Sequence, residues 1–271
     1  MTEPGMEPAA PVAPVPPRPL TDFLSAVGFL TVLPVGRSWP EGRPPRSVGW
    51  FAWVGWLLGG LVALPLWLLS RYTGQPDILR SVLYGAVAVA VWAGLTRLLH
   101  WDGLADTFDG IWGAPTPARR LEIMRDSHIG AFGMVVIVLV ALVQVAAVTV
   151  AISRGQLWLL VAAPVIARFA VSLAAWELPA ARRDGLGATV MGRSRLYDRL
   201  VGGLAVLLLL VFLSGGLVTR NFVIVTGFGI AGGMFVPYIL SKQVGGMTGD
   251  LFGATVLLVE TLVLVIGALA L

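Results

Sequence analysis

Runs of apolar residues about 20 positions long, separated by short charged segments, dominate the chain. They cover residues 48–70, 80–98, 129–153, 155–176, 200–219, 221–241 and 251–271. A helix of about 20 apolar residues is long enough to cross the roughly 30 Å hydrocarbon core of a bilayer. The pattern therefore predicts an all-α fold, a polytopic transmembrane helical bundle of about seven spans.

The N-terminal region departs from this pattern. Residues 1–19 contain seven prolines and no apolar run, so we expect a disordered, proline-rich tail. Residues 20–271 are then expected to form a single integral-membrane domain. Within it, the apolar segment Phe23–Val35 is too short for a full crossing, and we expect an interfacial or re-entrant element there.

Composition agrees with a membrane protein. Of the 271 residues, 57% are hydrophobic and 13% are charged, against about 25% charged residues in soluble domains. The chain has no cysteine, which excludes disulfides, zinc–thiolate sites and thiol nucleophiles. The net charge is +4, but the basic residues stand singly between apolar runs, so nucleic acid is not expected as a partner.

The basic residues also predict an orientation in the membrane. With seven spans, fourteen Lys and Arg residues fall on one side, and the other side holds only Arg71, Arg80, Arg154 and Arg220. Cytoplasmic loops carry the excess of Lys and Arg. We therefore expect a multi-pass protein of the inner cell membrane, whose loops after the second, fourth and sixth spans share the cytoplasmic face.

The candidate chemistry lies between the second and third spans. Residues 97–133 hold five of the fifteen acidic residues, and Asp102, Asp106 and Asp109 follow the spacing i, i+4, i+7. On a helix this spacing puts all three on one face. Carboxylates that close repel one another, and Mg²⁺ with oxygen ligands removes the repulsion. The spacing predicts a magnesium site that binds a diphosphate, although a solvated acidic turn remains the alternative.

Neighbouring residues extend this hypothesis. Asp126 could complete the metal shell, with Arg125 neutralising phosphate and Ser127 donating a hydrogen bond. The alternative is a helix with local Glu–Arg pairing. His100 and Asp109 are the candidate catalytic groups for proton transfer, although a lone His at a membrane boundary is equally often structural. The glycines that follow two of the aspartates, Gly103 and Gly110, are expected to let a ligand approach the backbone.

Two further regions carry charge at or within the membrane. Arg168 lies in the middle of a span, where a charge is costly and usually functional; it could face a polar cavity or a partner such as Glu177, an aspartate, or Glu260 of the last span. The segment GGMTGD (245–250) could form a tight glycine turn whose amides and Thr248 hydroxyl contact an anion. Asp250 could be another Mg²⁺ ligand, and Arg182 another contact for substrate phosphate.

Three segments in this order, HWDGLADTFDG, LEIMRDSHIGAFG and GGMTGDLFGA, closely resemble the cobalamin synthase family of adenosylcobinamide-GDP ribazoletransferases. The resemblance runs from about Phe23 to the C-terminus, and the FLTVLPVG segment and the GLG loop after Arg182 also fit. The proline-rich tail and His128, where an arginine is common, depart from the family pattern.

The resemblance implies a Mg²⁺-dependent transferase that completes the nucleotide loop of cobalamin. The 3′-hydroxyl of α-ribazole, or of its 5′-phosphate, would attack the phosphate attached to cobinamide and release GMP. The implied partners are the corrinoid-GDP and α-ribazole substrates and the lipid bilayer; a homo-oligomer is left open.

Two alternatives come from other classes. A CDP-alcohol phosphotransferase also uses aspartates and Mg²⁺ in a membrane bundle, but its pattern has an arginine where this chain has Asp106. A cation-coupled transporter could use the aspartates with Arg168 and Glu260 as a relay. A transporter would carry its charges near mid-membrane, whereas most of these lie at one face, which favours an enzyme.

Overall fold

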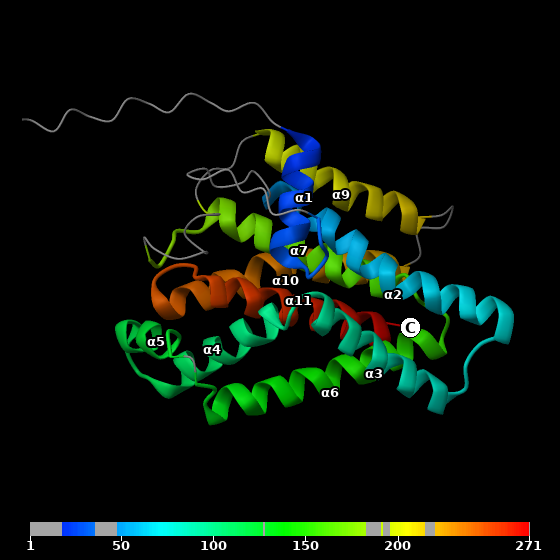
Figure 1. Ribbon diagram of the computed structural model, residues 1–271, viewed down its shortest axis with the longest axis horizontal. Coiled ribbons are helices and arrows are strands. Elements are labelled where there is room, and N and C mark those ends of the chain that lie inside the picture. Colours follow the sequence, from blue (N-terminus) through cyan, green and yellow to red (C-terminus); the bar gives the residue numbers. More distant parts are fainter. Residues whose placement is uncertain are drawn as a thin grey trace, which may run out of the picture.

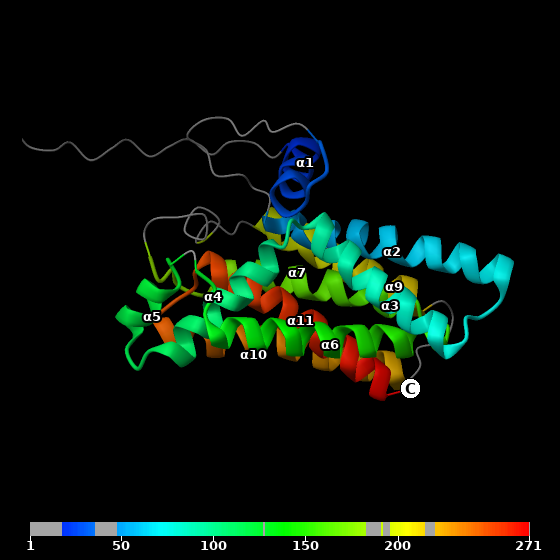
Figure 2. The ribbon, with the colours of Figure 1, turned by 60° about the horizontal axis from the view of Figure 1, so that its bottom comes forward.

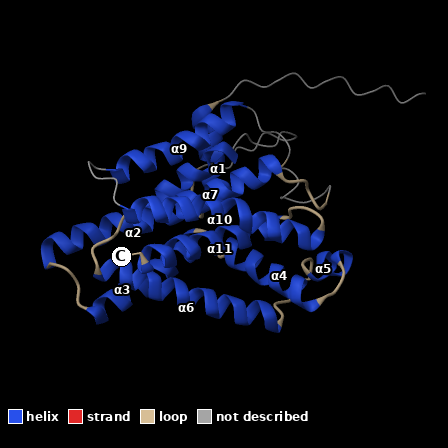
Figure 3. Cartoon of the chain, turned by 180° about the vertical axis from the view of Figure 1, so that it is seen from behind, coloured by secondary structure: helices blue, strands red, loops and turns tan. Residues whose placement is uncertain are grey.

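The computed structural model describes residues 18–35, 48–126, 128–182, 191, 196–214 and 220–270. Residues 1–17, which hold most of the expected proline-rich tail, lie outside the described residues. Within those residues the chain is helical apart from turns and one isolated bridge between Ala180 and Met247, and it contains no β-strand (Figure 3).

The helices follow the apolar runs closely (Figure 1). In chain order they are α1 (Pro19–Leu30), the 3₁₀ turn η1 (Val48–Trp50), α2 (Phe51–Thr73), α3 (Ile78–Leu95), α4 (Leu99–Gly113), α5 (Pro117–Ile123), α6 (Ala131–Ser153), α7 (Leu159–Glu177), α9 (Leu196–Ser214), α10 (Arg220–Val244) and α11 (Gly249–Leu269).

Six of the described helices are long and apolar enough to cross a membrane: α2 with its preceding turn, α3, α6, α7, α10 and α11. Helix α9 occupies the place of the fifth expected span, whose last residues, 215–219, lie outside the described part of the chain. The prediction of an all-α membrane bundle with about seven spans is confirmed.

Helix α1 differs from the spans in length and direction. It has 12 residues and runs across the direction of α2 and α6, as Figures 1 and 2 show. Its residues Ala26, Val27 and Leu30 are buried against the bundle. After it, the chain is non-helical from Thr31 to Val35. The prediction that Phe23–Val35 does not form a full crossing is therefore confirmed.

Helices α7 and α11 are the most buried of the spans. Glycines let α2 lie directly on α7: a Cβ on Gly55 would approach the carbonyl oxygen of Pro164 to 2.5 Å, and one on Gly59 would approach Val161 Cα to 2.6 Å. Small residues four positions apart allow such backbone contact between membrane helices. Gly55 and Gly59 therefore serve helix packing.

A strained turn joins α3 to α4. Arg97 and Leu98 both adopt left-handed backbone conformations, with φ of 52° and 58°. For residues with a Cβ this conformation costs about 1–2 kcal/mol each. Because of this conformation, only three residues separate α3 from α4, and α4 runs into the bundle rather than away from it.

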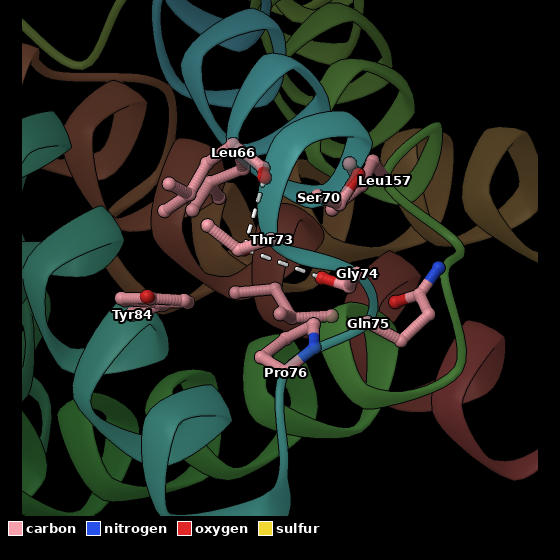
Figure 4. A pocket seen from close by; sticks show the side chains of 10 residues that line it. Leu66, Ser70, Thr73, Gly74, Gln75, Pro76, Tyr84 and Leu157 are labelled. Atoms are coloured by element: carbon pink, nitrogen blue, oxygen red, sulfur yellow. Dashed lines mark hydrogen bonds between the residues drawn. The ribbon is translucent and has the colours of Figure 1, made fainter.

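The 23 residues of α6 give it a length of roughly 34 Å, so its two ends lie near opposite faces of a membrane. Its C-terminal end borders a small cavity between Thr73, Tyr84 and Leu157 (Figure 4). The cavity's volume of about 10 Å³ leaves room for at most one water molecule. The acidic residues lie at the other end, beside the N-terminus of α6.

Candidate active site

The aspartates of the DGLADTFDG segment lie on α4, as their spacing predicted. Asp102 is exposed, Asp106 is half-buried and Asp109 is buried. The three therefore differ in access to a substrate, although they share one side of the helix.

A second helix brings a fourth carboxylate to this group. Asp250 lies in the first turn of α11, and α4 packs directly on that turn. A Cβ on Gly103 would lie 2.8 Å from the carbonyl oxygen of Asp250 and 3.2 Å from Gly253 Cα. The backbones of α4 and α11 are thus in contact, and each of the two helices carries carboxylates near this contact.

This contact corrects the role expected for the glycines of α4. Gly103 makes room for α11 rather than for a ligand. Gly110 makes room for α5, because a Cβ there would lie 2.9 Å from the carbonyl oxygen of Arg120. Both glycines therefore serve helix packing.

The electrostatics of the site follow from this arrangement. Burial raises the pKa of Asp106 from 3.8 to about 7, and the negative charges of Asp102, Asp250 and Asp109 contribute to this rise in that order of importance. Asp250 in turn interacts with Asp102. The fold thus collects negative charge from two helices that lie far apart in the sequence.

Among the described residues, Arg182 is a cation that lies next to this group. It interacts electrostatically with Asp250, and its Nη2 donates a hydrogen bond of 2.6 Å to the carbonyl oxygen of Leu121 on α5. Its position is set by the backbone: Met247 N–H donates to Pro179 (2.8 Å), and Ala181 N–H donates to Met247 (2.9 Å). The loops that carry Arg182 and Asp250 converge on α4.

Thr248 and the glycine turn before it hold Asp250 in place. The hydroxyl of Thr248 accepts a hydrogen bond from Leu251 N–H and donates to Asp250 Oδ2, so it caps α11. The amides of Gly245 and Gly246 both donate to the carbonyl oxygen of Ser241. The tight turn is present, but these two amides serve the end of α10 and do not face an anion.

Asp109 is tied to a neighbouring helix. Its two carboxylate oxygens accept hydrogen bonds from the backbone N–H groups of Gly130 (2.7 Å) and Gly133 (2.9 Å) at the N-terminus of α6. A Cβ on either glycine would collide with this carboxylate. Negative charge at a helix N-terminus is stabilising, so Asp109 joins α4 to α6. This geometry gives no support to the catalytic role expected for Asp109.

His100 lies on the inner side of α4, where its side chain is 4% exposed. Burial lowers its pKa well below the usual value, and the nearby charge of Arg168 lowers it further. Arg168 itself is buried and paired with Glu260. The sequence left the partner of Arg168 open, and in the structure this partner is Glu260. Because His100 and Arg168 are both buried, neither lies where a substrate phosphate would reach it.

The loop after α5 lies apart from the four carboxylates. Asp126 is exposed and bonds to the backbone and ring of His128 (3.0 and 2.6 Å), and it is not among the groups that shift the pKa of Asp106. Arg125 is exposed at the end of the same turn. The expected metal role of Asp126 is not supported by this geometry. Ser127 lies outside the described residues.

The sequence offered no reason to single out Arg120. Its Nε donates to the carbonyl oxygen of Ala114 (2.8 Å), and its Nη1 donates to the carbonyl oxygen and the Oε1 of Gln243 on α10. Arg120 therefore fixes α5 against α10 beside the site. Its only signal in the sequence is an arginine in a short helix that follows the aspartates.

In the described part of the chain, no three His, Asp or Glu side chains are placed closely enough to hold one metal ion together. Mg²⁺ does not require three such ligands, because it commonly takes one or two carboxylates together with water and substrate phosphate. The donor chemistry of Asp102, Asp106 and Asp250 therefore fits Mg²⁺.

Comparison with known proteins identifies the family of this chain. The family described as cobalamin-5-phosphate synthase matches residues 22–268. Adenosylcobinamide-GDP ribazoletransferase of Syntrophobacter fumaroxidans is 37% identical over 247 residues, covering 89% of this chain and 96% of the relative. The protein of the same name from Shigella boydii is 33% identical, with 88% and 95% covered. No solved structure matches.

The CDP-alcohol phosphotransferase and transporter alternatives have no support in these matches. The family match covers most of the chain, and the relatives exceed 30% identity over nearly their whole length. The chain therefore belongs to the cobalamin-5-phosphate synthase family.

Proposed function

We propose that Asp102, Asp106 and Asp250 form a Mg²⁺-dependent active site, at which the chain acts as an adenosylcobinamide-GDP ribazoletransferase of cobalamin biosynthesis. The attacking group is the 3′-hydroxyl of α-ribazole or of its 5′-phosphate. The leaving group is GMP, and the product is adenosylcobalamin or its 5′-phosphate.

The observation that carries this proposal is the concentration of carboxylates from two helices beside one arginine. Asp106 keeps its proton up to a pH of about 7, because burial removes water from it and three other carboxylates surround it. Such repulsion is relieved by a divalent cation. Bound Mg²⁺ would neutralise the diphosphate and hold its oxygens for displacement.

The side chains divide the remaining tasks. In the transfer, the ribazole oxygen forms a bond to the phosphorus that bears the cobinamide group, and the bond from that phosphorus to GMP breaks. A carboxylate of Asp102 or Asp106 accepts the proton of the attacking hydroxyl, because these are the groups of α4 with exposed surface. Asp109 is hydrogen-bonded to the N-terminus of α6 and His100 is buried, so both support the position of α4 instead.

Arg182 is suited to contact the diphosphate. Its guanidinium lies beside Asp250, and an arginine can hold two phosphate oxygens at once. Thr248 acts on Asp250 by fixing the first turn of α11. The corrinoid and nucleoside would then meet on the side of α4 where Asp102 is exposed.

We place this site on the cytoplasmic face of the inner membrane, in accord with the basic residues that flank it. Because the chain lacks cysteine, the single variants Pro115→Cys and Tyr72→Cys report opposite ends of the bundle without background. An impermeant thiol reagent added to intact cells should label the Tyr72→Cys protein and spare the Pro115→Cys protein. The reverse pattern would overturn the orientation.

The activity is tested with purified protein, cobinamide-GDP, α-ribazole and Mg²⁺, with GMP release as the readout. Asp102→Asn, Asp106→Asn and Asp250→Asn should each retain less than about a tenth of wild-type turnover, a loss of at least about 1.4 kcal/mol in transition-state stabilisation. Glu122→Gln is the matched control, because Glu122 is exposed on α5 and pairs with Arg119, away from the four carboxylates. Two asparagine variants with more than a tenth of wild-type turnover would refute the site.

A further inference from the structure

A short helix without a buried residue of its own lies beside the carboxylates. α5 has only seven residues, and none of them is buried. A helix of this length is not stable alone. Buried apolar contact comes from Met124, the residue after α5, which packs on Gly110 of α4. Hydrogen bonds therefore supply much of what holds α5 in place.

Arg120 donates three of these hydrogen bonds, and they go to the ends of two other helices. Its Nε donates to the carbonyl oxygen of Ala114, the C-cap residue of α4, at 2.8 Å. Its Nη1 donates to the carbonyl oxygen (3.0 Å) and to Oε1 (2.9 Å) of Gln243 in the last turn of α10. The last carbonyl groups of a helix have no partner within the helix, and a cation beside them is favourable. Arg120 thus caps the C-terminal ends of α4 and α10 at the same time.

A second set of contacts leads from the same end of α10 back to α5. Met247, in the turn after α10, makes backbone hydrogen bonds with Pro179 (2.8 Å) and Ala181 (2.9 Å). Arg182 follows directly, and its Nη2 donates to the carbonyl oxygen of Leu121 at 2.6 Å. This carbonyl belongs to α5 again. The contacts therefore form a closed ring that begins and ends on α5.

The ring connects Arg120 to the charged groups of the site. Arg182 interacts electrostatically with Asp250, and the carbonyl oxygen that receives its hydrogen bond is carried by α5. Without Arg120, α5 would lose its hydrogen bonds to the ends of α4 and α10. The acceptor that orients Arg182 would then no longer be held in place.

We propose that Arg120 is a positioning residue, which holds α5 so that Arg182 faces the diphosphate of the bound substrate. The inference rests on the proposed function, because it requires Arg182 to contact that diphosphate. It extends the proposed function by making the affinity for the corrinoid-GDP substrate depend on a double helix cap. The three acceptors lie on two helix ends, which suits the planar, five-donor guanidinium and not the single ammonium of a lysine.

The first measurement follows GMP release while cobinamide-GDP and α-ribazole are varied separately. Arg120→Ala should raise the KM for cobinamide-GDP about tenfold, the worth of a charge-assisted contact of Arg182, and leave the KM for α-ribazole unchanged. Arg120→Lys should recover only part of this loss, because an ammonium group cannot reach both helix ends. Unchanged KM values with a lower Tm would make Arg120 a purely structural residue and would overturn the proposal.

Arg119→Ala is the matched control. Arg119 is the neighbouring arginine on the same helix, but its side chain is exposed and pairs with Glu122. Exposed ion pairs contribute little to stability, so both KM values should stay at the wild-type level. A rise in the KM for cobinamide-GDP as large as that in Arg120→Ala would assign the effect to any change in α5, which would contradict a role of the double cap.

The Arg182→Ala background tests whether Arg120 acts through Arg182. Residues that belong to one hydrogen-bonded network are not additive, so in this background Arg120→Ala should have little further effect on the KM for cobinamide-GDP. If the two effects multiply, Arg120 acts independently of Arg182 and the proposal is wrong. If Arg182→Ala alone leaves this KM unchanged, Arg120 has no diphosphate contact to position, and the proposal is equally wrong.

A milder variant keeps the test open if Arg120→Ala does not fold. Gln243→Ala removes one of the three acceptors and leaves the carbonyl oxygen of the same residue in place. It should raise the KM for cobinamide-GDP in the same direction by a smaller factor. An unchanged KM in this variant would contradict the role of the contact with α10.

Amide hydrogen exchange tests the ring without any substrate. The amides of Ala181 and Met247, which are hydrogen-bonded within the ring, should exchange faster in Arg120→Ala than in Arg119→Ala. Equal exchange in the two variants would contradict the coupling of Arg120 to Arg182. Failure of the proposed function is distinct from this result, because the wild-type protein would then release no GMP, whatever the exchange shows.

Discussion

The contact of α4 with α11 through Gly103 should control both the position of the carboxylates and the rate of transfer. In Gly103→Ala, the new methyl group would stand 2.8 Å from the carbonyl oxygen of Asp250 and 3.1 Å from its Cα. Both neighbours are backbone atoms, so no side chain can rotate away. Relieving the overlap requires the helices to separate by a few tenths of an ångström or more, at a cost of about 1–3 kcal/mol.

The separation moves Asp250 away from Asp102 and Asp106. A misplacement of about 1 Å can lower catalysis by about a hundredfold, and we expect Gly103→Ala to lose at least tenfold in kcat while requiring more Mg²⁺. GMP release is measured over a Mg²⁺ titration, and thermal unfolding in detergent gives the stability.

Gly60→Ala is the matched control for this variant. Gly60 also lies in a helix, but a Cβ there meets no atom within 4 Å. The alanine should therefore be neutral or stabilise the helix by about 0.5–1 kcal/mol. A Gly103→Ala protein with wild-type kcat and Mg²⁺ midpoint would refute the argument that this contact positions the site.

Three further outcomes are expected. Asp109→Asn turns an NH₂ toward an amide of α6, so it should destabilise the protein by about 1.5–3 kcal/mol in thermal unfolding; a wild-type Tm with a shifted Mg²⁺ midpoint would instead make Asp109 a ligand. Because the pKa of Asp106 is raised from 3.8 to about 7 without a cation, Mg²⁺ must displace a proton. The apparent affinity of the protein for Mg²⁺, measured by calorimetry, should rise with pH up to about 7 and level off above it. Without a cation, the free energy of unfolding should fall from about pH 4 to 7. An affinity for Mg²⁺ that does not change with pH would contradict this. Glu260→Gln leaves the Arg168 charge buried alone and should cost about 3–5 kcal/mol, whereas replacing both residues with leucine should recover most of it; equal loss in the single and double variants would show that the pair does not act as a unit.

The apolar runs and the aspartate spacing were enough to predict the spans and the helical face of α4, because both depend on local periodicity. The i+7 position was harder to interpret. Asp109 lies on the same side as Asp102 but about two turns further along α4, where it meets α6. The glycines at 130 and 133 carried a signal for this, since both sit where the first turn of α6 needs room for a carboxylate.

Long-range packing could not be read from a single sequence. Nothing in the sequence says that Gly103 faces Gly253, and this contact is what brings Asp250 to α4. The pairing of Arg168 with Glu260 remained one of several choices until α7 and α11 were seen side by side. Arg120 was overlooked because its partners are mainly backbone carbonyls, which any sequence offers.

The carboxylates are divided between two kinds of helix, and this has a mechanical consequence. α11 crosses the bilayer and carries Asp250 in its first turn, whereas α4 has only 15 residues and is not among the spanning helices. A spanning helix tilts when bilayer thickness changes, whereas α4 does not span the bilayer. The contact of Gly103 with the first turn of α11 couples such a tilt to α4. Lipid acyl-chain length is therefore expected to change the position of Asp250 relative to the carboxylates of α4 through this backbone contact.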